Sequence, residues 1–249
     1  MTDVFLITLA FAVIFNFLFF IPAFLFNTDK LTDISYALTF LILALITVSI
    51  PITVPKIILL CMIGLWALRL GGFLFIRMLH MKRDHRFDKI RGKFVKFGGF
   101  FLLQAFSAWV ILIPSIVYLS NGDASLTALS WAGMAVWLIG ISIEKIADWQ
   151  KYKYKCRNKK TLCVRGLWKY SRHPNYFGEI LVWLGIFIFT MPLVWQYALI
   201  NFISPLYITV LLLLVTGIPK LERHMQRKYG KAFTKYKQST SMLIPWFRK

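Results

Sequence analysis

The sequence predicts an all-α polytopic membrane protein, and three features together indicate this class. Of its 249 residues, 58% are hydrophobic and 17% are aromatic, with a mean hydropathy of +0.65. This is too apolar for an ordinary soluble domain. The apolar residues fall into runs long enough to cross a bilayer as helices. The basic residues gather between some of these runs and are missing between others, as in multi-pass membrane proteins. We therefore expect about seven transmembrane helices.

The first apolar run, residues 4–26, has the length of one span, without a basic segment before it or a small-residue cleavage site after it. It therefore predicts a retained helix rather than a cleaved signal peptide. Six more runs have a similar length. The expected spans are 4–26, 34–54, 57–79, 97–119, 126–147, 175–193 and 196–217.

The connections between these runs have the composition of turns. Residues 49–55 and 190–196 contain proline, which ends helices, and residues 120–125 read SNGDAS, a polar turn. The sequence shows neither an internal repeat nor a linker between soluble domains. We therefore expect one transmembrane domain over residues 1–249.

The charge distribution predicts an orientation. The chain carries 30 Lys and Arg against 10 Asp and Glu, and the segments 77–96, 145–172 and 220–249 hold all but three of the basic residues. Because cytoplasmic loops are enriched in Lys and Arg, these segments are expected in the cytoplasm, with the N-terminus outside and the C-terminus inside. The net charge of +20 fits a membrane surface better than nucleic acid, since the basic segments alternate with spans.

The familiar short motifs are missing from the sequence. Cys61, Cys156 and Cys163 form no CxxC pair and no zinc-ligand spacing, so we expect neither a metal nor a disulfide. No G-x-G-x-x-G follows a strand, and no P-loop, nucleophile elbow or H-E-x-x-H occurs. A nucleotide would therefore bind without a Rossmann domain, on the basic cytoplasmic loops.

Ionisable side chains at membrane depth cost about 2.5–3.5 kcal/mol each and usually face a bundle interior or a wet cavity. Asp33 and Tyr36 stand at the start of the second expected span, and Arg69 lies inside the third. The few such residues in this apolar chain are therefore the candidates for a binding site.

Glu144 and Asp148 end the fifth expected span, and Lys155 continues at a helical spacing. Side chains at this spacing share one helix face, which would present acceptors and a cation to one ligand. The equally good alternative is a snorkelling helix end whose acid pairs with a nearby lysine.

The stretch SRHPNYFGE places polar side chains where the sixth expected span begins. Pro174 suits the first turn of a helix, and Gly178 allows close approach of another chain. Asn175 and Glu179 fall on one helix face, with Tyr176 next to it. This face is a candidate ligand site.

Arg172 and His173 come directly before this expected helix, where free amide groups also favour an anion. A phosphate-bearing ligand is the functional interpretation. The alternative is an anchor for lipid headgroups, which explains Arg172 well but explains Glu179 poorly, because a buried acid gains nothing from headgroups.

With these residues in view, the sequence resembles bacterial membrane proteins related to steroid 5-alpha-reductases, a family catalogued as a domain of unknown function, and more distantly the sterol reductases. The matching segments are DIS at 33–35, ALRLGGFLFIR at 67–77, EKIADWQKYKYK at 144–155, RGLWKYSRHPNYFGEILVWLG at 165–185 and TGIPKLERHMQRKYGKAFTKYKQSTSMLIPW at 216–246. They give the expected domain a core from residue 30 to 249. The resemblance implies a seven-helix fold in which NADPH, in a cytoplasm-facing cavity, donates hydride to the beta carbon of an enone.

Carried over position by position, the resemblance also implies the site residues. Glu179 falls where sterol reductases carry an acid near the nicotinamide and the substrate. The acid pair that polarises a steroid ketone is missing from the second span, and Trp66 replaces a tyrosine; Asp33 with Tyr36 would substitute, or the substrate is not a steroid. The implied cofactor-binding residues are Arg69, Arg77, Glu144, Asp148, Lys155, Asn175 and Tyr176, to which we add Arg172 and His173.

Two other functions are alternatives to the reductase. Isoprenylcysteine carboxyl methyltransferases, which bind S-adenosylmethionine, share RHPxYxG and a C-terminal YG…Y…P pattern, but they pair two acids where this chain has Glu222 alone. A transporter would favour symmetric, interrupted spans, which are missing. We therefore expect an NADPH-dependent reductase of a steroid-like or isoprenoid-like enone in the bacterial inner membrane. We expect no nucleic acid and no obligatory protein partner.

Overall fold

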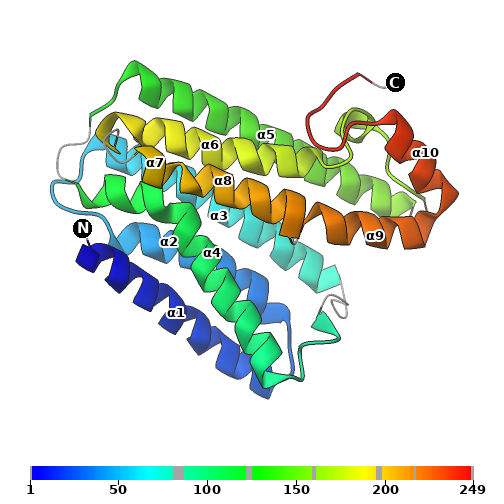
Figure 1. Cartoon of the computed structure of the whole chain (residues 1–249), viewed down its shortest axis with the longest axis horizontal. Coiled ribbons are helices and arrows are strands. Elements are labelled where there is room, and N and C mark those ends of the chain that lie inside the picture. Colours follow the sequence, from blue (N-terminus) through cyan, green and yellow to red (C-terminus); the bar gives the residue numbers. More distant parts are fainter. Residues whose placement is uncertain are drawn as a thin grey trace. The chain divides into compact units, whose positions relative to one another are not determined.

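The computed structural model describes residues 2–80, 87–121, 125–158, 161–194, 198–215 and 217–247, without the side chains of 73–80, 194, 198 and 199. The described part is helical and contains no strand, only an isolated bridge between Ser171 and Ser241. Its elements (Figure 1) are α1 (Thr2–Leu25), α2 (Lys30–Ile46), α3 (Val54–His80), α4 (Phe94–Ser120), α5 (Ala128–Arg157), the 3-10 helix η2 (Gly166–Lys169), α6 (Pro174–Val194), α7 (Ala198–Asn201), α8 (Ile203–Val210), the π-helical turn η4 (Leu211–Val215), α9 (Ile218–Tyr229) and α10 (Lys231–Ser239).

The all-α membrane class is confirmed. Within the described residues, six helices are long and apolar enough to cross a membrane. They are α1, α3, α4, α5, α6 and the run Ile203–Tyr229 formed by α8, η4 and α9. The chain is therefore an integral, multi-pass membrane protein.

The expected span at 34–54 differs most from the sequence expectation. Its helix, α2, has 17 residues and ends at Ile46, short of the ~20 that a full crossing needs. The proline-containing turn after it is held by Lys56 of α3, which is fully buried. Lys56 Nζ donates to the Ser49 carbonyl at 2.8 Å, to Ser49 Oγ at 2.8 Å and to the Pro51 carbonyl at 3.1 Å. These bonds satisfy backbone carbonyls of a turn that cannot continue the helix.

The last expected span, 196–217, also has different limits. Its helical run extends beyond the expected end, through the basic residues of α9 to Tyr229. In α9 the polar and apolar residues alternate with a helical period, so the helix buries Ile218 and Met225 while its basic side chains stay outside. Basic composition thus marks one face of this helix rather than its end.

The chain divides into two compact units, which are described separately. The first comprises Met1–Ala128 and Thr190–Ser204, and the second comprises Leu129–Phe189 and Pro205–Lys249. The expectation of one domain over the whole chain stays a prediction.

The first unit packs α1, α2 and α4 around an aromatic cluster, and α3 packs against α2. Phe20 of α1 meets Phe97 and Phe101 of α4 edge to face, with ring centroids 6.0 and 5.7 Å apart. Arg91, just before α4, donates to the Asp29 carboxylate ahead of α2 at 2.7 Å, and both side chains are largely buried. Apolar packing and one shielded ion pair therefore hold these helices together.

In the second unit, α5 and α6 touch backbone to backbone. A Cβ added to Gly140 of α5 would lie 2.8 Å from the carbonyl oxygen of Gly178 in α6. Seven residues away on each helix, a Cβ added to Gly185 would lie 2.7 Å from the carbonyl oxygen of Gly133. The N-terminal part of α5 thus lies beside the C-terminal part of α6, so the helices are antiparallel (Figure 1). Only glycine permits this separation, as is common between membrane helices.

We expect Gly185→Ala to destabilise the protein by about 1–3 kcal/mol, because the new methyl would meet the Trp137 backbone nitrogen at 2.5 Å, and backbone cannot move aside as a side chain does. Gly99→Ala in α4 is the control, since its Cβ would meet nothing within 4 Å. The measurement is thermal unfolding in detergent. Equal melting temperatures for the two variants would contradict the close packing of α5 on α6.

Candidate functional site

The glycine contact between α5 and α6 sets the position of Glu144. A Cβ on Gly178 would lie 2.8 Å from the Glu144 backbone nitrogen and 2.9 Å from its Cβ. Glu144 is therefore against the second turn of α6, and its side chain is buried at 4% exposure. Asp148 lies one turn further along α5, at the level where the antiparallel α6 begins.

The first two turns of α6 carry the other predicted residues. Asn175, Tyr176 and Glu179 are all half-buried. The Trp183 indole, which is fully buried, donates to Glu179 Oε1 at 2.9 Å and fixes the carboxylate along the helix. Residues predicted from two separate segments, Glu144 with Asp148 and Asn175 to Glu179, thus come together at one end of the helix pair.

Hydrogen bonds of Ser171 and His173 fix the loop before α6. His173 caps the helix, since its carbonyl accepts from the Phe177 N–H at 3.1 Å. The His173 N–H donates to Ser171 Oγ at 3.1 Å, and Ser171 Oγ donates to the Leu243 carbonyl at 2.6 Å. Pro174 occupies the first helical position, as expected.

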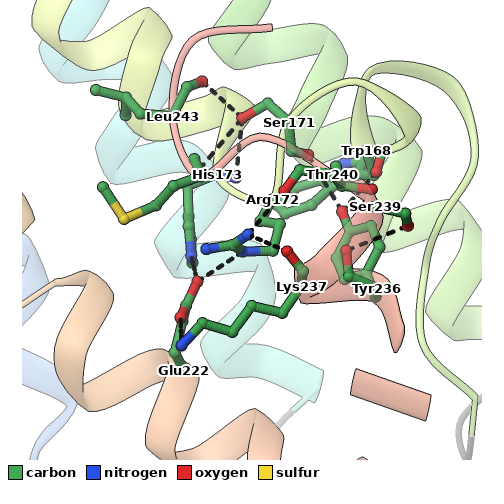
Figure 2. A network of polar contacts seen from close by, with 11 residues as sticks. Trp168, Ser171, Arg172, His173, Glu222, Tyr236, Lys237, Ser239, Thr240 and Leu243 are labelled. Carbon is green, nitrogen blue, oxygen red and sulfur yellow. Dashed lines mark hydrogen bonds and ion pairs between the residues drawn. The ribbon is translucent and has the colours of Figure 1, made fainter. Parts of the chain in front are cut away.

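Arg172 is buried and binds the protein itself (Figure 2). Its Nε donates to Glu222 Oε1 of α9 at 2.8 Å. Its Nη1 donates to the carbonyls of Lys237 at 3.0 Å and Thr240 at 2.7 Å. Three of its hydrogen bonds therefore join the loop before α6 to α9, to the last turn of α10 and to Thr240 after it.

His173 turns toward the same carboxylate. Its Nε2 lies 3.2 Å from Glu222 Oε1, its side chain has no exposed surface, and its ring stacks on Tyr176 with centroids 5.6 Å apart. Burial lowers the pKa of the imidazole below its usual value, and the nearby Glu222 carboxylate offsets this only in part. The ring is therefore neutral at pH 7.

Residues 240–247, which we term the C-terminal segment, pair with the loop before α6. The Arg172 N–H donates to the Ser241 carbonyl at 2.8 Å, and the Trp246 N–H donates to the Tyr170 carbonyl at 3.1 Å. Tyr236 of α10 adds a hydrogen bond from its hydroxyl to the Trp168 carbonyl at 2.5 Å. These hydrogen bonds hold the C-terminal segment and α10 against the loop before α6.

Lys155, the remaining cofactor candidate of this unit, is engaged with the protein. Its Nζ donates to the Thr161 carbonyl at 2.5 Å and to the Tyr229 hydroxyl at 2.6 Å, and it also lies over the Tyr229 ring. Lys155 therefore ties the end of α5 to the end of α9.

The four other predicted residues belong to the first unit. Asp33 and Tyr36 lie half-buried near the start of α2, and Arg69 is half-buried on α3. The Tyr36 ring meets Phe40 edge to face at 5.0 Å, and Phe40 in turn meets Trp66 at 4.8 Å. The side chain of Arg77 lies outside the described residues. A single site combining these residues with those of α5 and α6 stays a prediction.

The sequence reasoning missed the role of Glu222, which it noted only as a single acid. The available signal was its isolation, because it is one carboxylate in the strongly basic segment from Lys220 to Lys237. In the structure, Arg172, His173 and Lys237 all approach it (Figure 2), with Lys237 Nζ at 3.5 Å.

Comparison with known proteins gives a family. The chain matches the family described as "Protein of unknown function (DUF1295)" over residues 19–240, which is most of its length. It belongs to this family. An uncharacterized protein of Schizosaccharomyces pombe is 26% identical over 109 residues, a match that covers 35% of this chain and 32% of the yeast protein. The chain thus aligns with about a third of that relative. No solved structure matches significantly.

We expect Arg172→Met to destabilise the protein by about 3–5 kcal/mol, because it leaves the mostly buried Glu222 with only the exposed Lys237 as a cationic partner and frees two carbonyls. Lys169→Met removes an exposed charge from the same loop and serves as the control. Thermal unfolding gives the stability, and amide hydrogen exchange should rise in the C-terminal segment. Unchanged exchange there would show that Arg172 does not hold that segment.

We also expect a pH dependence from His173. Because its pKa is lower in the folded protein than in the unfolded chain, acid adds protons to the unfolded chain first. Above about pH 6.5 the titration of His173 therefore leaves the free energy of unfolding unchanged. Below that pH the free energy of unfolding falls, by at most about 1.4 kcal/mol per pH unit. Glu222, Arg172 and Lys151 are the charged groups that act on it.

The measurement is thermal unfolding between pH 7.5 and 5. His173→Gln should flatten the loss of stability on acidification, whereas His224→Gln, at an exposed position, should not. An equally steep loss in His173→Gln and the unmodified protein would exclude His173 as the source.

Proposed function

We propose that the protein is an NADPH-dependent membrane reductase that transfers hydride to the C=C bond of a hydrophobic enone, a steroid-like or isoprenoid-like lipid. The observation that carries this proposal is the gathering of Glu144 and Asp148 with Asn175, Tyr176 and Glu179 at one end of the α5–α6 pair. These are the residues that the resemblance to steroid 5-alpha-reductases implies for the cofactor and the substrate.

The residue types suit a nucleotide. Glu144 and Asp148 offer carboxylate oxygens, which accept hydrogen bonds from ribose hydroxyls. The N-terminal end of a helix such as α6 favours a pyrophosphate. Arg69 and Arg77 are the cations assigned to the 2′-phosphate, which would give a preference for NADPH over NADH.

The proposed chemistry needs an acid or a phenol close to the substrate. NADPH, when bound, supplies the hydride. Hydride addition to an enone builds negative charge on the carbonyl oxygen, which a hydrogen-bond donor must stabilise. Glu179, held by Trp183, is the acid nearest the nicotinamide half in this assignment, and Asp33 with Tyr36 is the pair assigned to the carbonyl.

The structure changes the role that we assign to two of the predicted residues. Arg172 donates three hydrogen bonds to Glu222 and to backbone carbonyls, and Lys155 donates to Tyr229 and Thr161. We therefore propose that both residues hold the segments around the cofactor site in place and do not bind the phosphates of the cofactor. His173 stays in the binding set.

The setting of the enzyme is part of the proposal. The three basic segments are assigned to the cytoplasm, with the N-terminus outside, in a bacterial inner membrane. The substrate then enters from the lipid and NADPH from the cytoplasm, so one domain serves both phases without an obligatory protein partner.

A methyltransferase using S-adenosylmethionine is the second candidate, and the RHPxYxG pattern favours it. Against it, Glu222 is the acid that would have to serve as one of a pair near the methyl donor. Its carboxylate is occupied by Arg172 and His173, at 2.8 and 3.2 Å.

The test is a thermal-shift titration of the detergent-solubilised protein with NADPH, NADH and S-adenosylmethionine, since a ligand of the native state raises its stability. NADPH should give the largest shift. Asn175→Ala should weaken NADPH binding, whereas Glu179→Gln should bind it within twofold and lose at least about a hundredfold in turnover of a model enone.

Glutamine can still accept the Trp183 hydrogen bond, so Glu179→Gln is matched in shape to the unmodified protein. Stabilisation by S-adenosylmethionine alone would replace the reductase with the methyltransferase. Full enone turnover by Glu179→Gln would remove Glu179 from the chemistry.

A further inference from the structure

Glu222 is shared by two side chains of the loop before α6. Its Oε1 lies 2.8 Å from Arg172 Nε and 3.2 Å from His173 Nε2, and its Oε2 lies 3.5 Å from Lys237 Nζ (Figure 2). Because Arg172 and Lys237 are cations, the Glu222 carboxylate between them is ionised and can only accept hydrogen bonds. His173 therefore donates its Nε2–H to Glu222, and the lone pair is on Nδ1.

The Nδ1 atom of His173 is a buried acceptor. It has no hydrogen-bond partner within the described residues, and the side chain has no exposed surface. A buried polar atom without a hydrogen-bond partner is costly, so each one in a native protein needs a physical reason, and a role in binding a ligand is one such reason.

The surroundings of this atom point to a nucleotide. His173 caps α6, a helix of 21 residues, and its ring stacks on Tyr176, one of the proposed cofactor-binding residues. Asn175, which belongs to the same set, follows His173 by two residues. The acceptor is thus at the helix end where the proposed function places the ligand, and a hydroxyl or an amide N–H is the complementary group.

We propose that Glu222 is a positioning residue, which fixes His173 so that Nδ1 accepts a hydrogen bond from a hydroxyl or amide N–H of the bound nucleotide. This inference deepens the proposed function and rests on it. Through Arg172, the same carboxylate links this acceptor to the C-terminal segment, so the nucleotide end of α6 and the chain end share one anchor.

The first test is independent of any ligand. Nitrogen NMR of protein labelled with 15N-histidine, without nucleotide, should show one histidine in the neutral Nε2–H form. That signal should change in Glu222→Gln and persist in Lys237→Met, which removes the exposed third partner. A charged ring, or a neutral ring with the proton on Nδ1, would overturn the proposal.

The second test separates the two nitrogens. His173→Gln places an amide near the position of Nε2 and removes the Nδ1 acceptor, whereas His173→Asn places its amide near Nδ1 and loses the Glu222 contact. We expect His173→Gln to melt near the unmodified protein at pH 7.5 and to bind NADPH about tenfold more weakly. His173→Asn should melt lower and retain more of the affinity.

The outcomes distinguish this inference from the function on which it rests. If the unmodified protein binds neither NADPH nor NADH, both fail. If it binds NADPH and His173→Gln binds equally well, only the inference fails. A tenfold loss that persists with 2′-phospho-ADP-ribose, which lacks nicotinamide, would assign the donor to a ribose hydroxyl. A loss confined to NADPH would assign it to the carboxamide.

Discussion

The backbone contact between α5 and α6 is the constraint on which the second unit depends. Lipid tails are as apolar as leucine side chains, so burial of apolar surface does little to hold two helices together inside a bilayer. Gly133 and Gly140 on one helix and Gly178 and Gly185 on the other allow backbone atoms to touch over one heptad. Close backbone packing of this kind gains dispersion energy instead. Because the backbones touch at these glycines, the register of the two helices is fixed, and Glu144 of α5 lies against the first turns of α6.

A second constraint works outside the apolar part of the unit. In a chain with a net charge of +20, one carboxylate, Glu222, collects Arg172, His173 and Lys237. Removing such charges from water is costly unless hydrogen bonds and ion pairs within the protein replace those that each group makes with water. Here the guanidinium is satisfied by a carboxylate and two carbonyls at once. The network therefore specifies one arrangement of α9, α10 and the loop before α6, which is more than general attraction between a basic tail and a membrane provides.

Much of the fold follows from local pattern, and the failures of prediction follow from distance along the chain. Apolar runs of spanning length gave the helices, and Pro174 marked the start of α6, because both signals lie within a few residues. The helical spacing of Glu144 and Asp148 correctly put them on one helix. The inward turn of Arg172 was not predictable in this way, since its partners Glu222, Lys237 and Thr240 lie 50 to 68 residues away. A basic residue before a helix looks the same in sequence whether it binds a phosphate or a carbonyl.

The buried lysine at the start of α3 affects how the distribution of basic residues is used to predict membrane orientation. Lys56 is the basic residue in the connection after α2, which the expected topology puts on the outer side, and it stands as a counterexample to an otherwise one-sided distribution. Its ammonium is wholly enclosed and bonded to Ser49 and Pro51. An enclosed cation offers nothing to the anionic lipid surface that produces the sidedness rule. Lys56 thus stabilises a turn and carries no information on topology, and without it the connections that are expected outside contain no basic residue.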